Sequence, residues 1–145
     1  MSTTGVKIVL DTNILISIIG RKSPFRWIFD GIIHGNIILC VSNEIIFEYK
    51  EILQLKNGVE VADNMIDFFT IHPFVEKREL YYNFQLITED QDDNKFVDCA
   101  IAANAYCIVS NDKHFRVLKD IDFPRVNIMT LEGFEREFKQ KFITK

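Results

Sequence analysis

Four acidic residues stand at places in the chain where a fold could bring them together. Asp11 and Asp112 each come directly after a short apolar run, and Glu48 and Asp98 border the apolar stripes of two predicted helices. Carboxylates held close together repel one another, and a divalent cation relieves that repulsion. All-oxygen ligands favour Mg²⁺ or Mn²⁺ over zinc, because no clustered His or Cys accompanies them.

A divalent cation held by carboxylates is suited to phosphate chemistry. It polarises a phosphoryl oxygen, lowers the pKa of a bound water and stabilises charge on the leaving oxygen. The chain has no Walker-type glycine loop, no GxGxxG and no Ser-His pair that would indicate another chemistry. Of His34, His72 and His114, expected on the surface or in loops, only the last is close enough to Asp112 to line a site. Each acid alone could instead be a turn, cap or surface residue.

Alternating apolar runs and amphipathic segments are the elements that would position these acids. The pattern predicts a three-layer α/β/α sandwich with a mostly parallel sheet of about four to five strands. The expected strands are 6–10, 37–41, 74–75, 107–110 and 126–129, and the expected helices are 14–19, 24–34, 43–55, 60–71, 94–106, a turn at 113–118 and a last helix capped by Thr130. Right-handed crossovers would place the strand ends, and the acids after them, on one edge of the sheet.

Small polar residues mark where several of these helices should begin. Thr12 or Asn13 is expected to cap the first helix and Ser42 the third, since each side chain can accept a bond from a first-turn amide. Asp93 is expected to cap the helix that contains Asp98, in preference to joining the outer shell of a metal. The preceding residues 88–93 form an acidic loop, and the aromatic residues of 81–84 are expected to pack against the core.

The composition indicates one ordinary domain. The chain has 145 residues, of which 48% are hydrophobic and 13 are Phe, enough core material for a single domain over 1–145. The net charge of -4 and the pI of about 5.4 lack the basic footprint usual for nucleic-acid binding. A site built from carboxylates lowers the net charge by itself, so this weighs against a nucleic-acid function without excluding it.

Cysteine usage and the apolar segments indicate a cytoplasmic protein. Cys40, Cys99 and Cys107 are odd in number, lie inside apolar stretches and form no CxxC pair, as expected for core residues of a reduced protein. The longest apolar segment, 8–19, is interrupted by polar residues and has no cleavage site after it. We therefore expect neither a signal peptide nor a membrane span.

The order of these motifs resembles the PIN-domain family, in particular the VapC-like toxin components of type II toxin-antitoxin systems. The resemblance extends from about residue 6 to 130. It rests on Ile8-Val9-Leu10-Asp11-Thr12-Asn13, Ser42 followed by Glu48-Tyr49, Asp92-Asp93-Asn94 leading into Asp98-Cys99-Ala100-Ile101-Ala102-Ala103, and Ile108-Val109-Ser110-Asn111-Asp112.

The resemblance implies a Mg²⁺-dependent ribonuclease that cuts single-stranded or looped RNA. By this resemblance the four acids would be Asp11, Glu48, Asp98 and Asp112, with Asn13 as a supporting residue. The first and third would bind the metal directly, and the other two would hold further water or a second ion. A water activated by the metal would attack phosphorus in line and leave a 5′-phosphate and a 3′-hydroxyl.

One position departs from the family pattern. The family usually has a threonine two positions before the fourth acid, and Ser110 stands there in this chain, which keeps a hydroxyl.

RNA binding and partners follow from the same resemblance. Basic residues near the acids are candidates for contacts with RNA phosphates, although solvated surface charge is an equal alternative for each. They are Arg21, Lys22, Arg26, Lys95 and Lys113, with His114 and Arg116 beside the last. The resemblance also implies a small antitoxin protein that blocks the site. A homodimer is possible, with Phe47 either in its contact surface or packed beneath residues 79–84.

Two other functions stay open from the sequence. A PIN-like module could bind RNA or protein without cutting it, although the intact set of acids argues against this. A Mg²⁺-dependent phosphatase of the dehalogenase or receiver type would use Asp11 as a phosphorylated nucleophile. It would need a second acid beside Asp11 and a suitably placed lysine, and Asn13 cannot donate a proton in that role.

Overall fold

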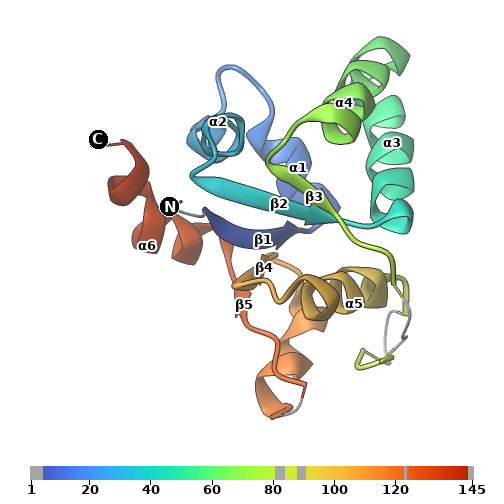
Figure 1. Ribbon diagram of the computed structural model, residues 1–145, viewed down its shortest axis with the longest axis vertical. Helices are drawn as coiled ribbons and strands as arrows, with labels where there is room; N and C mark the ends of the chain where they lie inside the picture. Colours follow the sequence, from blue (N-terminus) through green and yellow to red (C-terminus); the bar gives the residue numbers. More distant parts are fainter. Residues whose placement is uncertain (1–4, 81–83, 88–90, 123, 144–145) are drawn as a thin grey trace.

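A five-stranded parallel sheet forms the centre of the computed structural model, which describes residues 5–80, 84–87, 91–122 and 124–143 (Figure 1). The strand order is β3-β2-β1-β4-β5, and every pair of neighbours is parallel. The strands are β1 (Val6–Leu10), β2 (Ile37–Val41), β3 (Val75–Lys77), β4 (Cys107–Val109) and β5 (Ile128–Met129). The predicted α/β class and sheet are confirmed, with all strands parallel.

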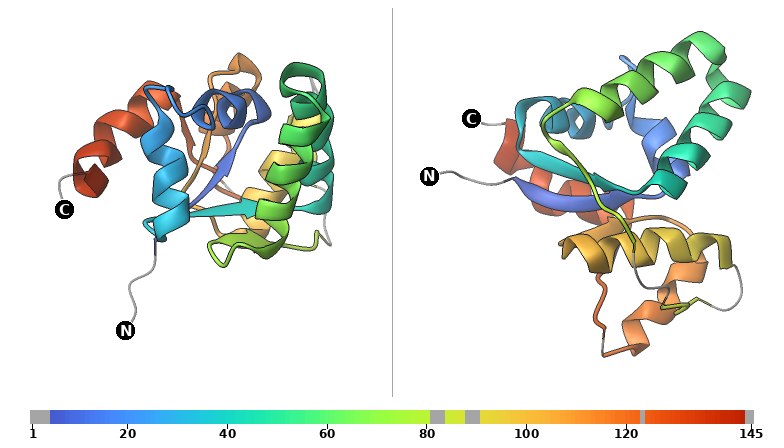
Figure 2. Two further views of the ribbon diagram at one scale, coloured as in Figure 1. Left: turned by 90° about the horizontal axis from the view of Figure 1, so that it is seen from above. Right: turned by 45° about the vertical axis from the view of Figure 1, so that its right-hand side comes forward.

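Helices cover both faces of this sheet. They are α1 (Thr12–Ile18), α2 (Arg26–His34), α3 (Asn43–Asn57), α4 (Val59–Ile71), α5 (Asn94–Ala103) and α6 (Leu131–Ile143), with 3₁₀ helices η1 (Gln91–Asp93) and η2 (Lys113–Asp120). Helices α1 to α4 lie on one side of the sheet and α5 on the other, and α6 packs beside α2 (Figures 1 and 2). The ring of Trp27 in α2 stacks on Phe134 of α6, with centroids 5.8 Å apart.

Burial on both faces explains why the sequences of the central strands are continuously apolar. Residues Ile8, Val9 and Leu10 of β1 and all of β4 are fully buried, because helices cover both faces of the sheet. The three free cysteines are buried among them, as predicted, and burial raises the pKa of each thiol to about 12. In the part of the chain that the structure describes, no helix is long and apolar enough to cross a membrane.

Helix α3 is fixed against the carboxyl end of β1 by one buried hydroxyl. Tyr49 in α3 donates a hydrogen bond of 2.5 Å to the carbonyl oxygen of Leu10, the last residue of β1. The predicted cap at the start of this helix is confirmed, since the Ser42 side chain accepts a bond from the Ile45 amide. This contact places the preceding residue, Glu48, next to the position after β1.

Two other predicted caps, at the starts of α1 and α5, are wrong. Helix α1 begins at Thr12 itself, so Asp11 takes the N-cap position without a side-chain cap bond. Asp93 precedes α5 and its side chain makes no cap bond either. Thr130 does cap α6, accepting a bond of 3.0 Å from the Gly133 amide.

The ends of the predicted elements shift by a few residues. Helix α5 stops at Ala103 rather than near 106, because Asn104 adopts the left-handed conformation (φ 53°, ψ 49°) that ends helices. The last strand is shorter than predicted, only Ile128–Met129. Residues 88–90 of the predicted acidic loop, and 81–83 of the aromatic segment, lie outside the described residues.

Candidate active site

Asp11 lies at the carboxyl end of the central strand and is only 8% exposed. Its Oδ2 accepts a hydrogen bond of 2.8 Å from the Ser110 hydroxyl. Burial raises the pKa of the Asp11 carboxyl above its ordinary value, the Ser110 bond lowers it, and the charges of Asp112 and Glu48 raise it further. A carboxylate in these surroundings is stabilised by a nearby cation.

Ser110 also orients Asp112, which follows the end of β4. The Ser110 oxygen accepts a bond of 3.0 Å from the Asp112 amide, and Asp112 Oδ1 accepts one of 2.9 Å from the His114 amide. Asp11 and Asp112, with Asn13 among others, line one cavity of about 350 Å³. The structure therefore brings together two of the four predicted acids and two of the three predicted supporting residues, Asn13 and Ser110.

Asp93 and His114 extend this group on the far side of Asp112. The His114 Nδ1 lies 3.4 Å from Asp112 Oδ1 and 3.6 Å from Asp93 Oδ2. One donor atom from each of the three residues lies within 4.8 Å of the others, a spacing that could hold a metal ion. We call Asp11, Asp93, Asp112 and His114 the strand-end site.

Glu48 lies beside this site and has two partners from the protein. The Thr12 hydroxyl donates to Glu48 Oε2, and Lys95 Nζ lies 2.7 Å from Glu48 Oε1. As predicted, Glu48 is closer to the core than the neighbouring acids Glu44 and Glu51, which are exposed. Thr12 thus uses its hydroxyl on Glu48 instead of capping α1.

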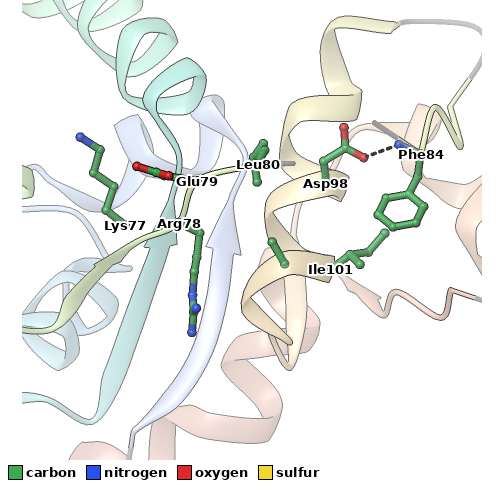
Figure 3. Close-up of a pocket in the computed structure, with 8 residues that line it drawn as sticks. Lys77, Arg78, Glu79, Leu80, Phe84, Asp98 and Ile101 are labelled. Atoms are coloured by element: carbon green, nitrogen blue, oxygen red, sulfur yellow. Dashed lines mark hydrogen bonds between the residues drawn. The ribbon is translucent and has the colours of Figure 1, made fainter. Parts of the chain in front are cut away.

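Asp98 points away from the strand-end site. Its Oδ1 accepts a hydrogen bond of 3.1 Å from the Phe84 amide, and it lines a different cavity of about 580 Å³ with Lys77, Arg78 and Ile101 among others (Figure 3). Burial raises the pKa of the Asp98 carboxyl, the Phe84 amide lowers it, and the Glu44 charge raises it. The structure therefore does not bring Asp98 together with Asp11.

The position of Asp98 along α5 explains this difference. In a right-handed crossover the helix begins near the carboxyl edge of the sheet, and Figure 1 shows the start of α5 at that edge. Asp98 is five residues beyond Asp93, which moves it about 7.5 Å along the helix and turns it by ~140°. The acid at the start of the helix therefore reaches the strand ends, and the acid in the second turn does not.

The predicted RNA-binding cations divide into two groups. Arg21, Lys22 and Lys113 are exposed. Arg26 instead pairs with Asp30 at 3.3 Å and places its guanidinium 4.6 Å from the ring centroid of Phe29. Lys95 pairs with Glu48, as described above, so these last two side chains have partners within the protein.

Comparison with known families agrees with this arrangement. A family model described as PIN domain matches residues 7–114, which include every residue of the strand-end site and Glu48. This chain belongs to the PIN-domain family. A search of curated protein sequences found no match.

Solved structures share the fold of this PIN-domain chain. It is similar to VapBC2 from Rickettsia felis, solved with a promoter DNA fragment (TM-score 0.60, 18% identity), and to VapBC-1 from nontypeable Haemophilus influenzae (0.56, 19%). It is also similar to DNA-bound VapBC from Salmonella typhimurium (0.53, 14%). Each match covers 86% of this chain and 98% of the other. At these identities the likeness establishes the fold.

Sequence reasoning about this PIN domain did not predict the contacts of Thr12, Asp93 and Lys95, although it included Asp93 as a supporting site residue and Lys95 as an RNA-binding candidate. The first two are standard capping residues, so local preference favoured a cap for each. The available signal was position, because both residues stand at a helix start next to the strand ends. No local pattern could have paired Lys95 with Glu48, which lies 47 positions earlier in the chain.

Proposed function

We propose that this PIN-domain protein is a Mg²⁺- or Mn²⁺-dependent endoribonuclease and the toxin of a toxin-antitoxin pair. The observation that supports it is the arrangement at the carboxyl edge of the sheet, where open α/β folds bind their ligands: Asp11 lies beside Asp112, and Asp112 lies within metal-binding distance of Asp93 and His114. We assign to Asp93 the metal-ligand role that the family resemblance implied for Asp98, since Asp93 shares a site with Asp112.

The donor atoms of the strand-end site fit a hard divalent cation. They are mostly carboxylate oxygens, the ligands that Mg²⁺ and Mn²⁺ prefer, with the His114 nitrogen as an additional donor. When bound there, such an ion supplies Lewis-acid chemistry: it lowers the pKa of water and stabilises charge developing on a phosphate. Asp93, Asp112 and His114 would hold it, with Asp11 beside Asp112.

The remaining residues of the site position these acids. Ser110 holds Asp11 through its hydroxyl and the Asp112 backbone through its oxygen, so one side chain fixes the spacing of two acids. Asn13 is exposed at the rim of the same cavity, where it can contact substrate. The exposed cations Arg21, Lys22 and Lys113 would attract the RNA phosphates that the acids alone would repel.

The toxin assignment rests on likeness to the VapBC structures, which is an argument from analogy. It predicts a small antitoxin protein that covers the strand-end site, and growth arrest when this chain is produced alone. A short reading frame next to this one, whose product co-purifies with the chain and restores growth, would support it. A homodimer is a further part of the proposal. Phe47 is 73% exposed, so it is available to a second copy rather than buried within the chain.

The direct test of the nuclease proposal is Asp11→Asn. The amide can still accept the Ser110 bond but carries no charge, so the fold should persist. We expect Mg²⁺-dependent cleavage of a single-stranded RNA to fall by at least about 100-fold, which is about 2.7 kcal/mol in the barrier. Circular dichroism and the melting temperature serve as the control for folding.

Three results would contradict the proposal. Unchanged RNA cleavage by Asp11→Asn would remove Asp11 from the chemistry. Hydrolysis of a phosphomonoester such as p-nitrophenyl phosphate, without RNA cleavage, would favour a phosphatase. RNA binding by the wild type with neither cleavage nor Mg²⁺ binding would indicate a non-catalytic module.

A further inference from the structure

Lys95 is an almost buried cation beside the strand-end site. Its side chain is 11% exposed, and its Nζ lies 2.7 Å from Glu48 Oε1. Most surface lysines keep the ammonium in water and gain little from an ion pair. The Lys95 side chain is instead largely buried and held in a defined position, with its positive charge next to the Glu48 carboxylate.

Three groups fix the ammonium of Lys95. Besides Glu48, it donates a hydrogen bond of 2.7 Å to the carbonyl oxygen of Asp92 and lies 5.4 Å from the ring centroid of Phe96. An ammonium has three donors, and two of them are used by these oxygens. The side chain is therefore held in one place before any ligand arrives.

Glu48 is correspondingly satisfied by the protein. One of its oxygens contacts Lys95, and the other accepts the Thr12 hydroxyl. Asp11, by contrast, is buried and lies beside the like charges of Asp112 and Glu48. The two acids nearest the end of β1 thus differ in their electrostatic surroundings. Glu48 has a positive partner within the protein, and Asp11 has like charges beside it.

The cavities separate the same two groups. Glu48 and Lys95 line a depression of about 400 Å³ together with Glu44, Glu51 and Asp92. Asp11 and Asp112 line the other cavity, and among the described residues the two cavities share none. Glu48 therefore borders the strand-end site without opening into the cavity beside Asp11.

We infer that Lys95 is the built-in counter-cation of Glu48 and limits the strand-end site to a single divalent ion. In sites with two metals the second ion sits ~3.5–4 Å from the first and neutralises the additional carboxylates. Here a fixed ammonium already neutralises Glu48, and it repels a second cation that approaches that carboxylate. Lys95 is thus a positioning residue rather than an RNA contact. This inference rests on the proposed metal-dependent function.

The test is the number of Mn²⁺ ions that the full chain binds, measured by calorimetric titration and by the loss of the free-ion signal in electron paramagnetic resonance. We expect about one ion per chain for the wild type and about two for Lys95→Met, which frees Glu48. Lys95→Arg should restore a single ion, because it keeps the charge. Lys113→Met is the matched control: it removes one positive charge beside Asp112, and among the described residues Lys113 has no recorded ion pair. It should still bind one.

The outcomes separate the two proposals. Two ions in the wild type, or one ion in a folded Lys95→Met, would overturn the role of Lys95 and leave the nuclease proposal standing. No ion bound by the wild type would overturn both, since the strand-end site would then hold no metal. Two ions in Lys113→Met would mean that any loss of positive charge suffices, which also contradicts a specific role for Lys95.

Discussion

Asp93 and Asp98 stand five residues apart at the same helix, and both are buried, yet their surroundings differ. Asp93, just before α5, lies with Asp112 and His114 at the strand ends. Asp98, in the second turn, accepts a bond from the Phe84 amide on the other side of the helix. The comparison shows that a buried carboxylate is not by itself a sign of chemistry, because a backbone amide can be its partner.

The Asp98 side of α5 holds a chain segment in place. Asn94, one turn earlier, accepts a bond of 2.9 Å from the Ile87 amide and donates one of 2.8 Å to the Ile87 carbonyl. With the Asp98 bond to Phe84, three hydrogen bonds fix residues 84–87 against this face. One face of the helix therefore anchors the chain, and its beginning contributes to the strand-end site.

The largest expected effect comes from exchanging each of these two acids for its amide. Asp93→Asn should lower Mg²⁺-dependent RNA cleavage by at least about 100-fold, because it removes a charge from the strand-end site. Asp98→Asn should change the rate by less than about threefold, because the amide oxygen can still accept the Phe84 bond. Initial rates under saturating Mg²⁺ would measure both.

A second readout separates metal binding from activity. Saturating Mg²⁺ should raise the melting temperature of the wild type and of Asp98→Asn, since an ion that binds only the folded state stabilises it. The shift should shrink or vanish in Asp93→Asn. The reverse pattern, with Asp98→Asn inactive and without a shift, would restore the assignment made from the sequence.

A smaller effect concerns stability and its dependence on pH. Burial raises the pKa of Asp98 above its ordinary value of 3.8, so the folded state holds this proton more tightly than the unfolded state. The stability that this group contributes is present below pH 3.8 and is lost as the pH rises through the folded-state pKa. Asp98→Asn cannot ionise and should escape that loss.

We therefore expect Asp98→Asn to be more stable than the wild type at pH 7, where the ionised carboxylate carries the cost of its burial. The advantage should disappear near pH 4, and urea unfolding at the two pH values measures it. A variant that is less stable than the wild type at pH 7 would mean that the ionised carboxylate makes a favourable interaction that outweighs its burial.

The general architecture followed from the sequence because parallel strands buried on both faces have a clear pattern. The continuous apolar runs that became β1, β2 and β4, and the acids directly after them, predicted the sheet edge where Asp11 and Asp112 meet. The order of the strands is a tertiary property. It depends on long-range contacts such as those of α5 with β1, β2 and β4, which no local pattern encodes.

The identity of the third acid could not be read from helix periodicity alone. Both Asp93 and Asp98 are compatible with an amphipathic helix, and the family-like pattern around Ala100 to Ala103 favoured Asp98. The deciding facts are the depth of each residue along the helix and the side it faces. Residues 84–87 pack against the face of α5 that contains Asp98. That contact joins parts of the chain that no local pattern connects.

The smallest expected effect concerns the cations on the two sides, and it tests which side meets RNA. Arg21 and Lys22 follow α1, the helix that contributes to the cavity of Asp11 and Asp112, whereas Lys77 and Arg78 line the cavity beside Asp98. Each phosphate contact adds about 0.7 to the slope of log affinity against log salt for single strands.

In an Asp11→Asn background, which prevents cleavage, replacing Arg21 and Lys22 by Gln should flatten the slope by about 1.4. The matched double variant of Lys77 and Arg78 removes the same charge and should leave the slope unchanged. Equal flattening by both would mean that RNA responds to net charge alone, and flattening by the second pair only would place the RNA on the Asp98 side of α5.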